Sequence, residues 1–423
     1  MKDVKDIIVA IDIGTTKIVT IIGNVDGRGW VEISGKGVSR HDGIKRGIIV
    51  DIDIVADAIA RSVGIAEREA NLRVCSAYVN LFGFHSQIIP RSVSIPLTNK
   101  TFTVTQNEIE TLFEKTCQIT APKGMALVDV ISKQFIIDQY NGIKDPIGMS
   151  ASTVGLEADV IIGNSIYVQA VTKSMQNLGI KIDGFILESL AEAEVVLNDE
   201  EKEQGVLLVN VGGSLTDFSI HKEGQVILYK SVLVGGQHIT NDLALVMKIS
   251  VTEAEKIKRK YELALTSLIE NDQDIFVKDV ETSQRKSIKV SQTIEIIEAR
   301  IYDIFEIVKQ AIFDEGYQGS FNNIVLTGAG IHYMDGAPQM AQDVFKLSAR
   351  NASWRNVGGE NPENGIAVAM IKYISAQGKK QMKSSDILTP DDEDEIPRVG
   401  FDEFKRKVRV IQKKMKKLIN KLF

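Results

Sequence analysis

The sequence predicts an α/β fold of two similar domains, because one pattern of residues occurs twice. In residues 7–17 (IIVAIDIGTTK) an apolar run reads as a buried strand, and an acid, a glycine, two hydroxyl residues and a lysine follow it. Residues 206–219 (VLLVNVGGSLTDFS) give a second buried strand, a Gly-Gly turn, and then Ser214, Thr216 and Asp217. Two such strand-turn-strand units predict two domains that close on one nucleotide.

The first turn carries residue types that bind phosphate. Gly14 lets backbone N–H groups approach an anion, Thr15 and Thr16 add hydroxyl donors, and Lys17 neutralises negative charge. Asp12 is the candidate for holding Mg²⁺ through water. A plain glycine turn between two strands explains this motif alone about equally well, so the prediction depends on the turns that accompany it.

Two more glycine turns follow predicted strands in the second half of the chain. GGQHIT opens a helix at 235–236, and in residues 323–330 (NIVLTGAG) a strand enters a turn that suits close approach to a flat or charged ligand. If these turns had no role in binding, four glycine turns after four predicted strands would have to occur in this order by coincidence. The candidate ligand-binding residues in the turns are Asp12, Gly14, Thr15, Thr16, Lys17, Asn210, Gly212, Gly213, Ser214, Thr216, Gly235, Gly236, Gly328, Ala329 and Gly330.

Composition places the chain among globular proteins of more than one domain. It has 423 residues, 44% of them apolar, and a net charge of −6. Cys75 and Cys117 form no disulfide framework and the five histidines are scattered, so we predict a reducing compartment and no zinc site. The first apolar run ends at Asp12 and no run of about 18 apolar residues follows, which argues against secretion and against a membrane span. We expect no nucleic-acid partner.

The first domain is predicted to open as a β-meander and to continue as helix and strand. Residues 18–22 and 30–36 are predicted strands on either side of the turn GNVDGRG. Apolar residues at helical spacing predict a helix over 51–64, and another strand follows at 74–81.

Residues 84–162 read as a separate module with a small β-rich core. A helix begins near Thr105, with Glu108 as its capping-box partner. Nothing in the module points to chemistry, so an interaction surface is our prediction for it. Its predicted strands are 87–95, 127–137 and 153–162.

The second half is predicted to repeat the first. Helices are predicted over 167–179 and 186–197, and the acidic stretch 198–204 separates the halves. A long charged helix over 252–268 starts with a Thr/Glu capping box. The other predicted elements are a strand at 226–234, helices at 239–247 and 293–313, short strands within 270–290, and a small-residue helix at 365–374.

The C-terminal stretch differs from the rest in charge and pattern. Residues 378–400, with an acidic run between two prolines, are predicted to be a disordered linker. Residues 401–423 carry nine Lys and Arg against Asp402 and Glu403. They predict an amphipathic helix whose apolar arc contains Phe401, Phe404, Val408, Ile411, Met415, Leu418, Ile419 and Leu422.

That helix has two interpretations. It is either a target for a partner protein, or a helix that lies in the plane of a membrane with its apolar face down. An acidic tether before a terminal cationic helix favours the membrane, where anionic lipids attract the basic residues. Because one short helix anchors reversibly, polymerisation would add avidity by presenting many such helices at once.

The four turns, in this order, resemble the actin, sugar kinase and DnaK-type chaperone superfamily, whose fold is a pair of ribonuclease-H-like domains. The resemblance implies that the first two turns clamp the β- and γ-phosphates of ATP and that the other two frame the adenosine. AEKIK at 254–258 resembles the superfamily's ribose-side helix, which implies that Glu255 and Lys258 lie near the sugar. A solvated helix face is the alternative for both residues. Residues 187–197 and 365–374 match the helices that cross between the domains.

The DIGTTK opening, the module at 84–162 and the acidic linker before a basic helix together resemble the FtsA family, the actin-like cell-division proteins of bacteria. The resemblance covers essentially the whole chain. By that resemblance, residues 1–83 and 163–197 are subdomain 1A, 84–162 the inserted subdomain 1C, 205–240 and 301–377 subdomain 2A, and 241–300 subdomain 2B, with a linker at 378–400 and a membrane-targeting helix at 401–423.

The same resemblance implies a filament protein that binds ATP and Mg²⁺ and tethers the FtsZ ring to the cytoplasmic face of the membrane at the division site. Its expected partners are the C-terminal tail of FtsZ on 2B, further copies of itself, anionic lipids, and later division proteins on 1C. Arg300 stands where the family tends to hold a basic residue for the FtsZ tail; a surface salt bridge is the alternative.

One departure from the superfamily concerns hydrolysis. Many members that hydrolyse ATP have Asp where this chain has Asn210, and a neutral amide coordinates hydrated Mg²⁺ more weakly and accepts no proton. Asp12, Glu188 and Asp217 are the remaining candidate catalytic acids, so we predict slow or absent turnover. The alternatives to the division protein are a small-molecule kinase of the same fold and a PilM-type pilus-assembly adaptor.

Overall fold

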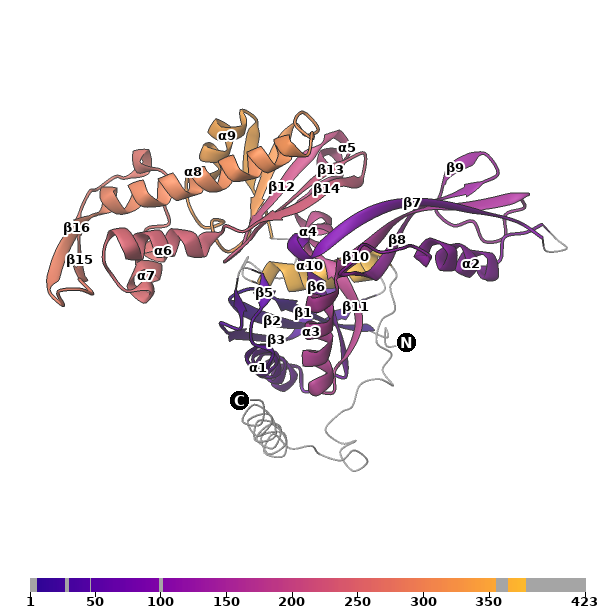
Figure 1. Ribbon diagram of the computed structural model, residues 1–423, viewed down its shortest axis with the longest axis horizontal. Helices are drawn as coiled ribbons and strands as arrows, with labels where there is room; N and C mark the ends of the chain where they lie inside the picture. The colour runs from indigo at the N-terminus through magenta and orange to yellow at the C-terminus, as the bar shows by residue number, and fades with distance from the viewer. Residues whose placement is uncertain (1–5, 27–29, 46, 99–101, 355–363, 378–423) are drawn as a thin grey trace, which may run out of the picture.

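The computed structural model describes residues 6–26, 30–45, 47–98, 102–354 and 364–377. In Figure 1 the first domain, whose first strands and α1 are indigo and whose α3 and β11 are magenta, lies below the second, in pink and orange. An inserted subdomain projects to the right, and the outer part of the second domain projects to the left. The two sheet-containing domains lie between these projections.

The first domain contains a five-stranded sheet in the order β11-β6-β1-β2-β3. The strands β1, β2 and β3 form an antiparallel meander, as predicted, and β6 and β11 run parallel to β1. The bounds are β1 (Asp6–Ile13), β2 (Lys17–Val25), β3 (Val31–Arg40), β6 (Ser76–Leu81) and β11 (Lys181–Leu187).

Helices cover both faces of this sheet. On one face lie α1 (Ile52–Ala70) and α3 (Ser165–Asn177), and on the other α4 (Glu188–Val196) and α10 (Gly365–Ala376). The apolar core that contains α4 and α10 also includes Val206 and Val325 of the second domain. This helix pair therefore lies between the two domains, where crossing helices are expected.

The second domain repeats this sheet. Its order is β14-β13-β12-β17-β18, and the strand directions match those of the first domain. The bounds are β12 (Val206–Val211), β13 (Thr216–Lys222), β14 (Gln225–Val232), β17 (Asn323–Thr327) and β18 (Ser348–Asn351). The predicted duplication of one α/β unit is therefore present in the fold.

The outer part of the second domain is mostly helical. Its core is continuous with the inner face of the sheet, through residues such as Leu243, Ile257 and Phe305. The elements are α6 (Gly236–Val246), α7 (Val251–Tyr261), η2 (Thr266–Leu268), β15 (Asp274–Lys278), β16 (Arg285–Lys289) and α8 (Val290–Asp314), with α9 (Ala337–Phe345) against the sheet.

The inserted subdomain has its own small core. A four-stranded sheet in the order β7-β10-β8-β9 packs against one helix, α2 (Gln106–Cys117). The predicted capping box is present: Glu108 accepts a hydrogen bond from the backbone N–H of Thr105, at 2.9 Å. The strands are β7 (Ser86–Pro96), β8 (Met125–Ile137), β9 (Tyr140–Ile143) and β10 (Thr153–Asn164), and β7 follows η1 (Gly83–His85).

The structure corrects three predicted elements. The helix predicted over 252–268 ends at Tyr261, because Glu262 takes a left-handed conformation and its carbonyl accepts the N–H of Asp335 in a distant loop, while the Asp335 carbonyl accepts the N–H of Ala264. Its cap is the side chain of Ser250, which accepts from the N–H of Glu253 at 3.2 Å, rather than Thr252.

The other two corrections lie between the domains. Residues 186 and 187 belong to β11 and not to a helix, because they pair with β6 at the sheet edge. The acidic stretch at 198–204 forms a short helix, α5 (Asp199–Gln204), capped by Asn198 and Glu201. Both depend on pairing or capping that the apolar pattern does not reveal.

The predicted linker at 378–400 and the predicted amphipathic helix at 401–423 lie outside the described residues. Within the part that the structure describes, no helix combines the length and apolar character that a membrane crossing requires.

Candidate functional site

A cavity of 210 Å³ lies where the turns of the two domains face each other. It collects residues from both sheets and from α4, α6 and α7. Most of the predicted site residues line it: Asp12, Gly14, Thr15, Thr16, Lys17, Glu188, Asn210, Gly212, Gly213, Asp217, Gly236, Glu255, Lys258, Gly328, Ala329 and Gly330.

The first two turns have the same backbone geometry. The N–H of Gly14 donates to the carbonyl of Lys17, and the N–H of Gly212 donates to the carbonyl of Leu215, each at 2.9 Å. Such turns can present intervening N–H groups to an anion. The duplicated sequence pattern therefore produces a duplicated phosphate-binding geometry.

The two turns touch across the domain boundary. The N–H of Ser214 donates to the hydroxyl of Thr15 at 3.3 Å. A Cβ atom on Gly213 would lie 3.0 Å from the methyl group of Thr16. Gly213 therefore allows an approach that a larger residue would oppose.

The third and fourth turns pack on the second. Gly236 donates its N–H to the carbonyl of Gly212 at 2.9 Å, and Gly330 donates to the carbonyl of Val211 at 2.8 Å. A Cβ on Gly330 would lie 2.6 Å from that same Val211 oxygen. The glycines thus hold three turns of the second domain against one another.

Three predicted ligand residues do not line the cavity. The hydroxyl of Thr216 is buried and donates to the carbonyl of Val234 at 2.7 Å. Ser214 contributes its backbone to the contact with Thr15, and the N–H of Gly235 donates to His238 Nδ1 at 3.2 Å. All three shape the turns around the cavity.

Four buried carboxyl groups belong to the lining of the cavity. Burial raises the pKa of Asp12 to about 6 although Lys17 opposes the shift, and burial also raises the pKa of Asp217 to about 6. Burial and the neighbouring Asp12 and Asp217 raise the pKa of Glu188 well above its ordinary value. Glu192, which the sequence analysis did not identify, has its pKa raised by burial to about 8.

Hydrogen bonds orient these acids. Asn80 Nδ2 donates to Glu188 at 2.5 Å, and Asn210 Nδ2 donates to Glu192 at 3.0 Å. The hydroxyl of Thr327 donates to the other oxygen of Glu192 at 3.2 Å. Asn210 therefore serves as a donor to a buried acid in this chain.

The acidic cluster fits a hydrated cation. Its donors are oxygens, which Mg²⁺ prefers, and the charges of Asp12 and Asp217 oppose ionisation of Glu188, a repulsion that a cation would relieve. Among the described residues, no three carboxylate, imidazole or thiolate groups are placed to hold a metal ion directly. That Asp12 holds a metal ion through water stays a prediction.

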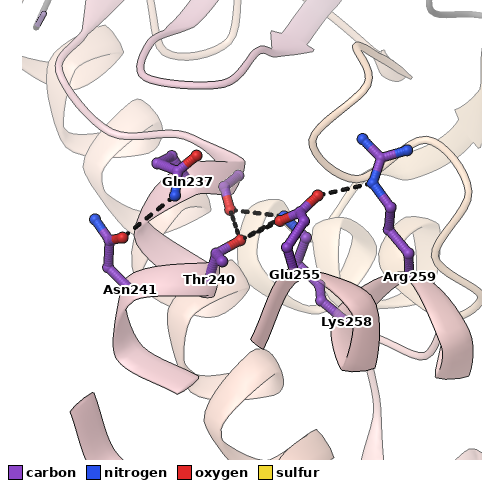
Figure 2. Close-up of polar contacts among 7 residues, drawn as sticks. Gln237, Thr240, Asn241, Glu255, Lys258 and Arg259 are labelled. Carbon is purple, nitrogen blue, oxygen red and sulfur yellow. Dashed lines mark hydrogen bonds and ion pairs between the residues drawn. The ribbon is translucent and has the colours of Figure 1, made fainter. Parts of the chain in front are cut away.

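Figure 2 shows the polar contacts between α6 and α7, four of whose labelled residues, Gln237, Glu255, Lys258 and Arg259, line the cavity. The ammonium group of Lys258 donates to the carbonyl of Gly236 at 3.0 Å, to the hydroxyl of Thr240 at 2.7 Å, and pairs with Glu255 at 2.6 Å. Glu255 also accepts from Arg259 Nε at 2.7 Å. Because Lys258 has three N–H groups and three partners, its role is to hold α6 and Glu255 in place.

Sequence reasoning missed several lining residues. Glu192 lies four positions after Glu188, so helical spacing alone would have placed both on one face. The others depend on packing between distant segments: Arg40, Phe82, Leu215, Gln237, Arg259, Thr327 and Ile366.

Arg300, the predicted contact for a partner, lies on α8 away from the cavity. Its guanidinium pairs with Asp242 and, at 3.3 Å, with Asp303. The side chain is partly exposed, so an acidic partner would have to compete with these two carboxylates.

Comparisons with known proteins give two family matches. Residues 207–378 match the family model described as cell division protein FtsA, and residues 83–162 match the one described as an SHS2 domain inserted in FtsA. The FtsA of Neisseria meningitidis serogroup B is 31% identical over 353 residues, which cover 82% of this chain and 84% of that protein. The FtsA of Pseudomonas aeruginosa is 29% identical, covering 86% and 88%, and that of Bacillus subtilis is 27% identical, covering 92% and 88%.

Solved structures give the fold. The PilM-PilN type IV pilus biogenesis complex has a chain with a TM-score of 0.58 and 14% identity, covering 88% of this chain and 98% of its own. MreB5 of Spiroplasma citri bound to ADP has a TM-score of 0.52 and 15% identity, covering 89% and 98%. The predicted actin-like fold is confirmed.

Proposed function

Because the chain belongs to the FtsA family of cell division proteins, we propose that it binds ATP between its two domains and acts as an actin-like filament protein that tethers the division ring to the membrane. The cell-division role follows from family membership, and the ligand, the partners and the location are the proposed part. MreB5 of Spiroplasma citri, a protein of the same fold, has been solved with ADP.

The contact between the two matching turns is the main support for the proposed ATP binding. The hydrogen bond from Ser214 to Thr15 brings both sets of backbone N–H groups to one cavity. Lys17 adds positive charge at the same place. A triphosphate bridging both turns would neutralise that charge and join the domains.

Bound Mg²⁺ would supply charge neutralisation of the phosphates. In this chain the carboxylate of Asp12 would hold it through water, and Glu188, Glu192 and Asp217 would be the other carboxyl groups around it. Glu255 and Lys258, which both line the cavity, would border the sugar.

We expect slow or absent ATP hydrolysis. Asn210 stands beside Glu192 as an amide donor and accepts no proton. Asp217 is held by two hydrogen bonds, from the N–H of Gly83 and from the hydroxyl of Ser231. Nucleotide would then act chiefly as a ligand that closes the domains and supports polymerisation.

The partners are assigned to separate parts of the chain. The FtsZ tail would dock on 241–300 with Arg300 at its edge, later division proteins on 84–162, and further copies of the chain along a filament. Residues 401–423 would bind anionic lipid on the cytoplasmic face of the membrane, joined by the linker at 378–400. Subdomain boundaries at 1–83 with 163–197 and at 205–240 with 301–377 complete this proposal.

Equilibrium binding of a fluorescent ATP analogue tests the cavity. We expect Lys17→Ala to weaken binding by about tenfold or more, which corresponds to about 1.4 kcal/mol. Lys181→Ala is the matched control, because Lys181 lies in the same sheet with its side chain 71% exposed and outside the cavity. Equal affinities of parent and Lys17→Ala would contradict the site.

Electron microscopy of the protein with ATP on an anionic lipid monolayer tests assembly. Filaments on the lipid favour the division protein over a small-molecule kinase or a PilM-type adaptor, because neither alternative needs the amphipathic tail. Phosphorylation of an added small molecule, without filaments, would favour the kinase.

A further inference from the structure

The inserted subdomain joins the first domain immediately beside the cavity. The chain leaves β6 at Leu81 and enters the insert at β7, and the residues between them are Phe82 and η1. Phe82 is buried and lines the cavity, with its ring 5.6 Å from that of Tyr167 on α3. The root of the insert therefore borders the same space as the proposed nucleotide.

Asp217 of the second domain binds the chain at Gly83, where the insert begins. Its Oδ1 accepts the backbone N–H of Gly83 at 2.9 Å and the hydroxyl of Ser231 from the neighbouring strand. A carboxylate that accepts two donors on one oxygen retains a second oxygen with full acceptor capacity. Asp217 also lines the cavity, so the same side chain contacts both the insert and the site.

The fit around Gly83 is tight. A Cβ at this position would lie 2.7 Å from the hydroxyl oxygen of Ser231, 2.9 Å from Asp217 Oδ1 and 3.0 Å from the ring of Tyr229. Three side chains of the second domain thus close on a residue of the first, and only glycine leaves room for them.

Beyond this contact the two parts line a shared groove. A groove of 820 Å³ lies between the insert and the edge strand β14. On its far side Lys133 of the insert donates to Gln225 of β14 at 3.0 Å. The groove gives the insert room to change its angle to the second domain while its root stays held.

We propose that Asp217 is a positioning residue which couples the occupancy of the cavity to the orientation of the inserted subdomain. One oxygen of its carboxylate holds Gly83, and the other is available to a hydrated cation or to a bound phosphate's water shell. A ligand that binds the second oxygen moves the Asp217 carboxylate or restricts its motion. Because the first oxygen accepts the N–H of Gly83, the orientation of the insert then changes as well. The coupling is reciprocal, so the orientation of the insert also changes ligand affinity. This inference rests on the proposed nucleotide site.

The test measures the distance between spin labels on the insert and on the second domain. Labels at Tyr140 and Phe313, both exposed, are attached to cysteines after Cys75 and Cys117 are replaced by serine. The full chain is measured without ligand and with ATP and Mg²⁺. In the parent we expect ATP and Mg²⁺ to shift or narrow the distance distribution.

Gly83→Ala and Ser231→Ala are expected to broaden the distribution without ligand and to abolish the response to ATP and Mg²⁺. Because the coupling is reciprocal, they should also change ATP affinity by about fivefold or more. Gly64→Ala is the control, because a Cβ there meets nothing closer than 3.8 Å. Asp217→Ala removes the acceptor for Gly83 and should also broaden the distribution. Asp217→Asn keeps an oxygen acceptor and should retain the narrow distribution of the parent. If Gly83→Ala fails to fold, Ser231→Ala carries the test.

Each outcome decides a different claim. An ATP response in Gly83→Ala and Ser231→Ala equal to that in Gly64→Ala would overturn the coupling, as would a parent that binds ATP without any change in distance. If the parent binds no ATP, the proposed function fails. Distributions without ligand then still decide whether Asp217 positions the insert.

Discussion

Replacing Glu192 by glutamine removes a buried carboxyl group whose proton the fold retains. Glu192 is 2% exposed, and burial raises its pKa from 4.5 to about 8 against the hydrogen bonds from Asn210 and Thr327. An acid whose pKa is raised in the folded state stabilises the fold while protonated. Its contribution is therefore complete below pH 4.5 and is lost as pH rises through about 8.

The magnitude follows from the separation of the two pKa values. At about 1.4 kcal/mol per pH unit, the loss is about 1 kcal/mol at pH 5, about 3 kcal/mol at pH 7 and about 4 kcal/mol at pH 8. Glutamine has no such proton to lose. The free energy of unfolding of Glu192→Gln, minus that of the parent, should therefore increase by about 3 kcal/mol between pH 5 and pH 8.

Urea unfolding of parent and variant across this pH range, without nucleotide or divalent cations, measures that difference. Hydrogen bonds that glutamine fails to make with Asn210 or Thr327 add an offset that does not depend on pH. Glu194→Gln is the matched control on the same helix, since the side chain of Glu194 is 41% exposed and its carboxylate lies 3.5 Å from the ammonium group of Lys202. Unfolding free energies of Glu192→Gln and the parent that run parallel with pH would refute the reasoning.

Three further predictions concern the site and the C-terminal stretch. Gly213→Ala should push the two turns apart, because its Cβ would lie 3.0 Å from Thr16. ATP affinity should then fall by about tenfold. An ATP affinity equal to that of Gly64→Ala would show that the two turns do not bind the nucleotide jointly. Asn210→Asp should place two carboxyl groups where a hydrogen bond of 3.0 Å now lies. It should cost about 1 to 3 kcal/mol of stability at pH 8, part of which Mg²⁺ restores in urea unfolding; equal stability with and without Mg²⁺ would argue against a cation site. Removal of residues 401–423 should leave a folded protein that binds ATP and no longer sediments with anionic liposomes, and sedimentation like that of the full chain would exclude the anchor.

The parts of the fold that the sequence predicts are those coded locally. The duplicated unit is visible because an apolar run and a glycine turn lie within a few residues of each other in both halves. The capping box at Thr105 and Glu108 is local for the same reason and is present. The end of α7 at Tyr261 is not local, because it depends on backbone hydrogen bonds to Asp335.

The same division applies to the site. Thr216 and Asp217 were both plausible cavity residues in the sequence, but successive side chains on a strand face opposite sides. Asp217 faces the cavity, so Thr216 points into the core and donates to Val234. The strand register decides between them, and no single motif contains that register. Arg40 and Phe82 come from segments that only the folded chain brings to the cavity.

A crystal structure of the full chain grown with ATP and Mg²⁺ tests the central claim most directly. We predict one nucleotide between the domains, with its β- and γ-phosphates against the turns at 14–17 and 212–214 and its adenosine between Glu255 and Gly328. A cavity without nucleotide at saturating ATP, or a nucleotide bound elsewhere on the chain, would contradict it.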